Sequence, residues 1–124
     1  FIQKNALEET LKRSKIELTI PKLIAELNLG FWVSLFGRKY EEVWRHSLRH
    51  IFTPEIKTIR RKDFHIDLNR IRELRNRIAH HEPIFKRKLF EEYQIILTLC
   101  NMICPKTASW ISINSRFLKN YKPL

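Results

Sequence analysis

Residues 63–81 read DFHIDLNRIRELRNRIAHH, and this stretch decides how the chain folds. Its apolar residues recur every three or four positions, which is typical of an amphipathic helix with one buried face. On a helical wheel they form one stripe: Phe64, Leu68, Ile71, Leu74, Ile78 and Ala79. We therefore expect a helix over residues 63–81, with Asp63 as its N-cap and its end imposed by Pro83.

Arg75 lies near the middle of this apolar stripe. A guanidinium in such a place needs a carboxylate, a bound phosphate or a water-filled cleft, because an isolated buried charge is costly. Asn76, His80 and His81 follow within about two helical turns. An arginine, an amide and two histidines are groups that can bind a phosphodiester and move its protons without a metal. The stretch therefore points to chemistry on a phosphodiester.

The spacing of these residues restricts how they can cooperate. Asn76 and His80 are four apart and share one side of the helix, with Arg72 one turn earlier. Arg75 and His80 are five apart, roughly 140° around an ideal helix. Three routes can bring them together: Arg75 can reach around the rim, the helix can loosen before Pro83, or a second copy can supply the complementary residue. We favour the first and third together.

The charge of the chain favours a polyanionic partner. The 124 residues carry a net charge of +11, which favours nucleic acid first and an anionic membrane surface second. The positive charge brackets the candidate site. The basic residues before and within the helix are Lys57, Arg60, Arg61, Lys62, Arg70, Arg72, Arg75 and Arg77, and Lys86, Arg87 and Lys88 follow the histidines. The alternative is a solvated basic face with no ligand.

The rest of the sequence predicts helices throughout. With 2 glycines, 5 prolines and no sustained alternation of apolar and polar residues, we expect an all-α bundle of about five to six helices in one domain over residues 1–124. The expected helices cover residues 5–18, a segment opened by Pro21 and broken at Gly30, residues 40–52, 63–81 and 86–102, and a last helix capped by Thr107. An aromatic block with Phe31, Trp32 and Phe36 favours core or dimer interface over base stacking.

The first residue is Phe1, which suggests a fragment of a longer protein. No apolar run reaches the roughly 18 residues that cross a bilayer. We therefore expect a cytoplasmic protein that does not use a membrane.

The sequence gives little reason to expect a metal or a cofactor. Cys100 and Cys104 are four apart in an apolar segment with no second ligand pair, so two reduced, packed thiols are expected. His46 and His50 are also four apart, but no third ligand accompanies them, and a solvated helix face is favoured. His65 is expected on the surface.

Two blocks of the sequence are similar to a known family. Residues 74–85, LRNRIAHHEPIF, resemble the signature of Abi-like abortive-infection proteins (AbiD/AbiF type) of the HEPN (higher eukaryote and prokaryote nucleotide-binding) superfamily. Arg75-Asn76-x-x-x-His80 resembles the R-x(4–6)-H motif of that superfamily. Residues 26–36, ELNLGFWVSLF, and the Tyr40 and Trp44 pair resemble the other recurrent block of the family. The resemblance covers about residues 22–85, and the chain would correspond to the C-terminal half of these longer proteins.

The resemblance implies a HEPN-like bundle that forms a homodimer, with motif helices from both copies around one cleft. It implies metal-independent cleavage of RNA, without a cofactor, by attack of a ribose 2′-OH that leaves a 2′,3′-cyclic phosphate and a 5′-OH. Arg75 and His80 would be catalytic, Asn76 would orient, and His81 would be auxiliary. The flanking residues expected to bind RNA are Arg72, Arg77, Lys86, Arg87 and Lys88. The implied role is phage defence or a toxin, which leaves room for an antitoxin or a guide-RNA or effector partner.

Three alternatives stay open at the level of the sequence. The domain can be a non-catalytic module that binds RNA or a nucleotide, or one that only dimerises. His81 can serve only the end of the helix, where a positive charge suits the dipole. Arg75 can pair with a buried carboxylate, with Glu42 and Glu73 as candidates by composition.

Overall fold

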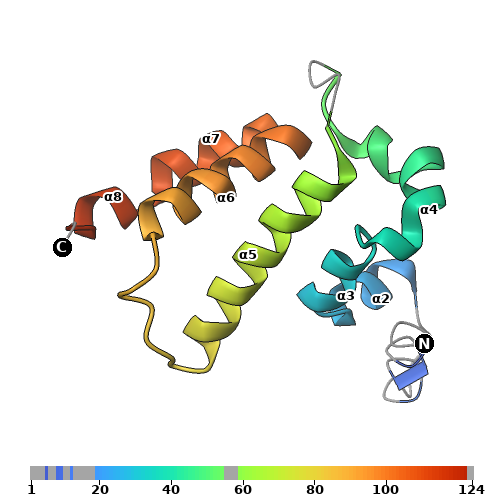
Figure 1. Cartoon of the computed structure of the whole chain (residues 1–124), viewed down its shortest axis with the longest axis horizontal. Coiled ribbons are helices and arrows are strands. Elements are labelled where there is room, and N and C mark those ends of the chain that lie inside the picture. Colours follow the sequence, from blue (N-terminus) through green and yellow to red (C-terminus); the bar gives the residue numbers. More distant parts are fainter. Residues whose placement is uncertain (1–4, 6–7, 10–11, 13–18, 55–58, 123–124) are drawn as a thin grey trace.

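The computed structural model describes residues 5, 8–9, 12, 19–54 and 59–122, and its regular elements are helices (Figure 1). The prediction of an all-α fold is confirmed, since no strand occurs in these ranges. The helix expected over residues 5–18 lies mostly outside the described residues.

The first half of the fold is built from short helices. These are α2 (Ile20–Glu26), α3 (Leu29–Ser34), the 3-10 helix η1 (Arg38–Tyr40), α4 (Glu41–His46) and the 3-10 helix η2 (Leu48–Ile51). Pro21 occupies the first turn of α2, as predicted. The side chain of Asn28 accepts a hydrogen bond from the Phe31 backbone N–H at 2.9 Å and caps α3. The break expected at Gly30 is therefore wrong, because Gly30 lies inside α3. The single helix expected over residues 40–52 is also wrong, since Ser47 interrupts it with φ −136° and ψ −59°.

The second half contains the longer helices: α5 (Arg61–Ala79), α6 (Leu89–Ile103), α7 (Pro105–Asn114) and α8 (Phe117–Asn120). In Figure 1, α5 crosses the middle of the molecule, with α3 and α4 on one side and the paired α6 and α7 on the other. The predicted N-cap of α5 is wrong: Arg60 is the N-cap, and Asp63 lies in the first turn. Asp63 binds the Arg60 Nε at 2.6 Å, and a carboxylate in this turn suits the positive end of the helix.

The cap expected at Thr107 is also displaced. Cys104 is the N-cap of α7, and Pro105 follows it in the first turn. Proline is favoured at this position, because its missing N–H would have no helical partner there. A bend at Ser115 and Arg116 separates α7 from α8, so the expected last helix is two helices.

The core joins α5 to the helices on both of its sides. Phe36, Trp44, Phe64 and Leu99 form one buried cluster. The Phe64 ring lies 4.9 Å from the ring of Phe36 and 4.8 Å from that of Phe52, measured between centroids. The core role predicted for Phe36 is therefore confirmed. This packing fixes the first half of α5, and the motif of residues 75–81 lies toward its other end.

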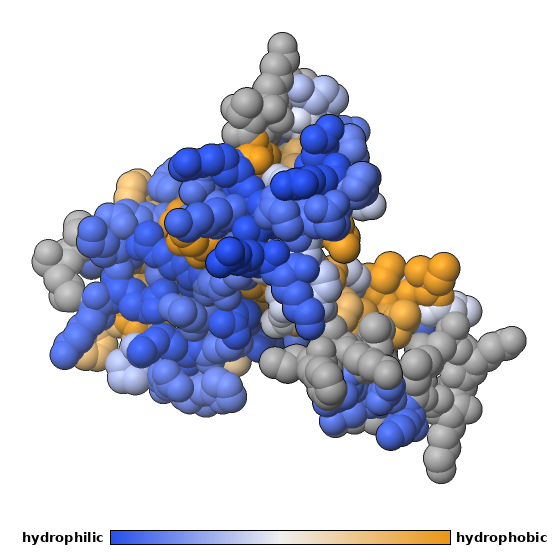
Figure 2. Space-filling view, turned by 45° about the vertical axis from the view of Figure 1, so that its right-hand side comes forward, coloured by the Kyte–Doolittle hydropathy of each residue, from blue (hydrophilic) through white to orange (hydrophobic). Residues whose placement is uncertain are grey.

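One face of the molecule is predominantly polar. Figure 2 shows a face covered mainly by hydrophilic residues, with hydrophobic patches between them. Among the helices in the described ranges, none combines the length and the apolarity that a membrane crossing needs.

Candidate functional site

The end of α5 is a Schellman motif, a backbone turn that closes the helix at its two histidines. The backbone N–H of Glu82 donates to the carbonyl of Arg77 at 2.8 Å, and that of His81 donates to the carbonyl of Ile78 at 3.1 Å. His81 takes the left-handed position that glycine usually fills, with φ 56°, a conformation that histidine adopts more readily than most residues. The predicted helix end is confirmed. His81 thus helps to close the helix end, as one alternative supposed. It does so through its backbone conformation and not through the charge of its ring.

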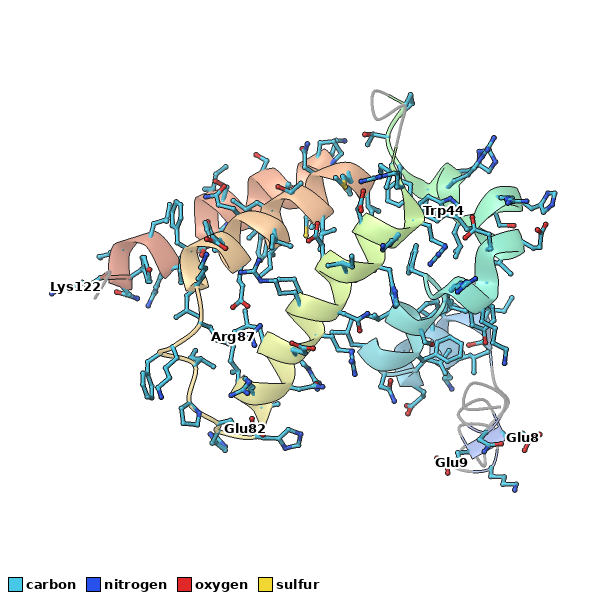
Figure 3. The ribbon with its side chains drawn as sticks, viewed as in Figure 1. Glu8, Glu9, Trp44, Glu82, Arg87 and Lys122 are labelled. Carbon is cyan, nitrogen blue, oxygen red and sulfur yellow. The ribbon has the colours of Figure 1, made fainter. Side chains whose placement is uncertain are left out.

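Arg77 reinforces this turn. Its Nη1 lies 3.7 Å from the Glu82 carboxylate and donates to the carbonyl of Pro83 at 3.3 Å. Figure 3 labels Glu82 at the bottom of the turn. Arg77 is exposed, so the same guanidinium that holds the turn is also open to solvent.

Arg75 is exposed, although the wheel places it within the apolar stripe. Its Nη1 donates to the side-chain oxygen of the neighbouring Asn76 at 3.3 Å. Over the described ranges, no carboxylate lies within ion-pair distance of Arg75. Of the two partners considered from the sequence, Glu42 pairs with an arginine and a histidine of α4 at 3.3 and 3.5 Å. Glu73 lies 3.9 Å from Arg87. Neither of the two carboxylates proposed from the sequence therefore pairs with Arg75.

His80 is exposed directly after α5, and its backbone N–H donates to the carbonyl of Asn76 at 2.9 Å. The helix keeps its regular form to Ala79, so it does not loosen ahead of the histidines. In the part of the chain described, no hydrogen bond joins the Arg75 guanidinium to the His80 ring. Three routes were open for bringing Arg75 and His80 together. Two of them fit this geometry: Arg75 can extend around the helix, or a second copy can supply the complementary residue.

The buried charge of this region is Glu92 of α6, which is only 1% exposed. Arg87 Nε donates to its two oxygens at 2.9 and 3.2 Å, and Arg70 Nε donates at 3.4 Å. Arg87 Nη2 also donates to the Arg70 carbonyl at 3.4 Å. The hydrogen bond that Arg87 donates to Glu92 raises the pKa of Arg87 above its ordinary value. In Figure 3, Arg87 lies between α5 and the loop that leads into α6.

This contact changes the expectation for the basic run after the histidines. The Arg87 guanidinium is engaged by Glu92, whereas Lys86 and Lys88 remain exposed. The Lys86 Nζ lies 6.0 Å from the centroid of the Phe85 ring. The Lys88 Nζ lies 3.0 Å from a carboxylate oxygen of Glu91.

A row of polar contacts on α5 was not anticipated. Asn69 contacts the Nε2 of His65 at 3.0 Å and accepts a hydrogen bond from the Nε of Arg72 at 3.2 Å. All three side chains are partly buried, so the surface position predicted for His65 holds only in part. Burial lowers the pKa of His65, and the charges of Arg61 and Arg72 lower it further. The spacing of four and three residues was the signal in the sequence that could have revealed this row.

The two cysteines have different surroundings. Cys100 is partly buried, and burial raises the pKa of its thiol. Cys104 is exposed, and hydrogen bonds from the hydroxyl and backbone N–H of Thr107 lower the pKa of its thiol. The expectation of two packed thiols therefore holds only for Cys100.

Two further features lie apart from the motif. A shallow pocket of about 410 Å³ is lined by residues of α6 and α7 and by no residue of the motif. Over the described ranges, no three His, Cys, Asp or Glu side chains gather as a metal site would require.

Comparison of the chain with models of protein families, with curated proteins and with solved structures found no match. Function must therefore be inferred from the chain itself, in which an exposed arginine contacts a partly exposed asparagine and two exposed histidines follow at a closed helix end.

Proposed function

We propose that this protein is a metal-independent endoribonuclease of the HEPN type. The observation that carries the proposal is the exposed Arg75 guanidinium, which contacts Asn76 and has no carboxylate partner in the described chain. Two exposed histidines follow it at a helix end whose backbone is closed by hydrogen bonds. A guanidinium without an acidic partner attracts phosphate, and its planar fork matches two phosphate oxygens.

The proposed reaction is an intramolecular transfer at phosphorus. The neutral ring of His80 accepts the proton of a ribose 2′-OH, the 2′-oxygen bonds to phosphorus, and the bond from phosphorus to the 5′-oxygen breaks. A protonated imidazole, from His81 or from a second copy of the motif, gives its proton to the leaving 5′-oxygen. The products are a 2′,3′-cyclic phosphate and a 5′-OH. Arg75 binds the oxygens on which charge develops, and Asn76 holds a ring nitrogen of His80 and selects its tautomer.

The same proposal includes a homodimer with a shared site. Five residues of helix separate Arg75 from His80 by roughly 140°, so a second motif helix would supply the missing group. Apolar side chains at this end of the molecule are available for contact, since Ile78 is 54% and Phe85 is 60% exposed. Covering such side chains contributes about 25 cal/mol for each Å² removed from water.

The proposed role is in phage defence or as a toxin, and a site shared between two copies allows such an activity to be controlled. A neutralising antitoxin or an effector that separates the two copies would switch off cleavage. The basic residues that would guide cytoplasmic RNA to the site are Arg72, Arg77, Lys86 and Lys88.

The test is cleavage of single-stranded and structured RNA by the purified chain in EDTA. Wild-type protein should release fragments that end in a 2′,3′-cyclic phosphate, identified by mass spectrometry. His80→Ala and Arg75→Ala should each lower the cleavage rate by at least about 100-fold. His50→Ala, a matched change of an exposed histidine on η2, should leave the rate unchanged. Equal cleavage by wild type and His80→Ala, with intact folding, would exclude His80 as the catalyst.

The second candidate is a module that binds RNA without cutting it. The separation of Arg75 from His80 within one chain favours it, because each can bind a phosphate without the other. This reading predicts RNA binding that weakens steeply with salt, no cleavage products, and similar losses of binding in Arg75→Ala and Lys86→Ala.

A further inference from the structure

The face of α5 that leads toward His80 carries polar side chains over several turns. His65, Asn69, Arg72 and Asn76 follow one another at intervals of four, three and four residues, which keeps them on one side of a helix. All four are partly exposed. The first two have no role in the reaction proposed above, so this row extends the site along the helix axis.

The contacts within the row fix the orientation of the Asn69 amide. Arg72 Nε can only donate a hydrogen bond, so the Asn69 atom that accepts it at 3.2 Å is the amide oxygen. The other end of the amide is then its NH₂ group, which lies 3.0 Å from the Nε2 of His65. An NH₂ group donates, so Nε2 must accept and carries no proton. In a neutral imidazole the proton is then on Nδ1.

That proton is available to a ligand. Burial and the nearby charges of Arg61 and Arg72 lower the pKa of His65 and favour the neutral ring. No described residue accepts a hydrogen bond from His65 Nδ1. Every buried side-chain nitrogen or oxygen in the described chain has a partner, so an unpartnered Nδ1 must reach solvent. The same reasoning holds for the terminal nitrogens of Arg72.

We propose that Arg72 and His65, held in register by Asn69, bind a second phosphate of the RNA strand at a distance from the bond that is cut. The Arg72 guanidinium supplies the charge, and His65 Nδ1–H supplies a neutral donor. The inference rests on the proposed function, because His80 defines where cleavage occurs. Asn69 is a positioning residue, since it orients His65.

The helix geometry sets the spacing of the two sites. Arg72 and His80 are eight residues apart, about 12 Å along the axis of an α-helix. A stacked strand advances about 3.4 Å per nucleotide, so the second phosphate lies about three or four nucleotides from the cut. A dinucleotide is too short to reach both sites, whereas an octanucleotide reaches both.

The experiment measures binding by fluorescence anisotropy with a labelled dinucleotide and a labelled octanucleotide of RNA. The proteins are wild type, His65→Ala, Asn69→Ala and the control His50→Ala, each checked by circular dichroism. His65→Ala and Asn69→Ala should weaken binding of the octanucleotide about tenfold and leave the dinucleotide unchanged. Asn69→Ala places a good helix former in α5, so it tests the proposal even if His65→Ala disturbs the packing beside Gly37.

A spectroscopic readout separates positioning from a structural role. Long-range ¹H–¹⁵N spectra of wild type should show His65 protonated at Nδ1, and Asn69→Ala should shift the ring toward the Nε2–H form. Unchanged octanucleotide binding in both variants, or equal losses at both RNA lengths, would overturn the proposal. A length-dependent loss of binding without any RNA cleavage would support this second site and refute only the nuclease activity.

Discussion

Replacing Arg87 with methionine should lower the free energy of unfolding by about 3 kcal/mol. The Glu92 side chain is 2% exposed and cannot be rehydrated without opening the fold. Arg87 supplies its shorter contacts, at 2.9 and 3.2 Å, and Arg70 remains at 3.4 Å. Removal of one partner of a buried ion pair costs about 3–5 kcal/mol. The lower end applies here because Arg70 stays in place and the Arg87 side chain is itself 19% exposed.

A double-mutant cycle isolates the interaction. Glu92→Met alone leaves Arg87 without its main acceptor, but Arg87 is partly exposed and can turn toward water, so about 2 kcal/mol should be lost. The double variant Arg87→Met/Glu92→Met removes both charges and fills the space with apolar atoms, which is often nearly neutral. Its loss should therefore be smaller than the sum of the single losses by at least about 1.5 kcal/mol.

The assay is thermal and urea unfolding followed by circular dichroism at 222 nm. Arg87→Met should lower Tm by about 10 °C, since 1 kcal/mol corresponds to about 3–5 °C in a domain of this size. Lys86→Met, one residue earlier and exposed, is the control and should change stability by less than about 0.5 kcal/mol. If Arg87→Met behaves like Lys86→Met, or if the two single losses simply add, the buried ion pair does not stabilise the fold as argued.

Three further outcomes follow from local geometry. His81→Gly should raise the free energy of unfolding by about 0.5–1 kcal/mol, because glycine adopts φ 56° without the left-handed penalty; a lower Tm in this variant would contradict it. Alkylation by iodoacetamide at pH 7, followed by mass spectrometry, should modify Cys104 before Cys100, because hydrogen bonds from Thr107 lower the pKa of the exposed thiol. Thr107→Ala should slow the Cys104 reaction, and an unchanged rate would remove Thr107 as the cause. The folded state binds a proton at His65 less readily than the unfolded state does, because the pKa of His65 is lowered on folding. Its contribution to stability is therefore complete above the unfolded pKa of about 6.5 and is lost as pH falls below it. Urea titrations at pH 7.5 and 5.0 should show a smaller acid-induced loss in His65→Gln than in wild type, and equal losses would rule out His65 as the source.

The helices with strong apolar periodicity could be predicted from the sequence, and their ends could be predicted only where one residue dominates. Pro83 predicted the end of α5, and Pro21 predicted the start of α2. At Gly30 the prediction failed, because the Asn28 side chain caps the next helix and glycine is tolerated in its first turn. Nothing in the sequence signals the break at Ser47, and the periodicity continues across it.

The candidate site shows a similar division. That residues 75–81 stand at the end of a helix followed from local rules, because proline and helical periodicity act within a few residues. The ion pair of Arg87 and Glu92 did not follow, although they are five residues apart, because Glu92 is buried and reached by Arg70 only when α5 packs against α6. The exposure of Arg75 also depends on packing, since a wheel shows which face is apolar but not how far along the helix its neighbours extend.

The closed turn after α5 alters what kind of ligand this helix end can accept. A helix terminates in carbonyl oxygens that bear partial negative charge, and such an end ordinarily repels a polyanion. Here the N–H groups of His81 and Glu82 occupy the carbonyls of Ile78 and Arg77. Fewer bare oxygens face the solvent, and the Arg77 guanidinium stands beside them. An anion approaching this end would therefore meet fewer bare acceptors than at an uncapped helix, with a cation beside them.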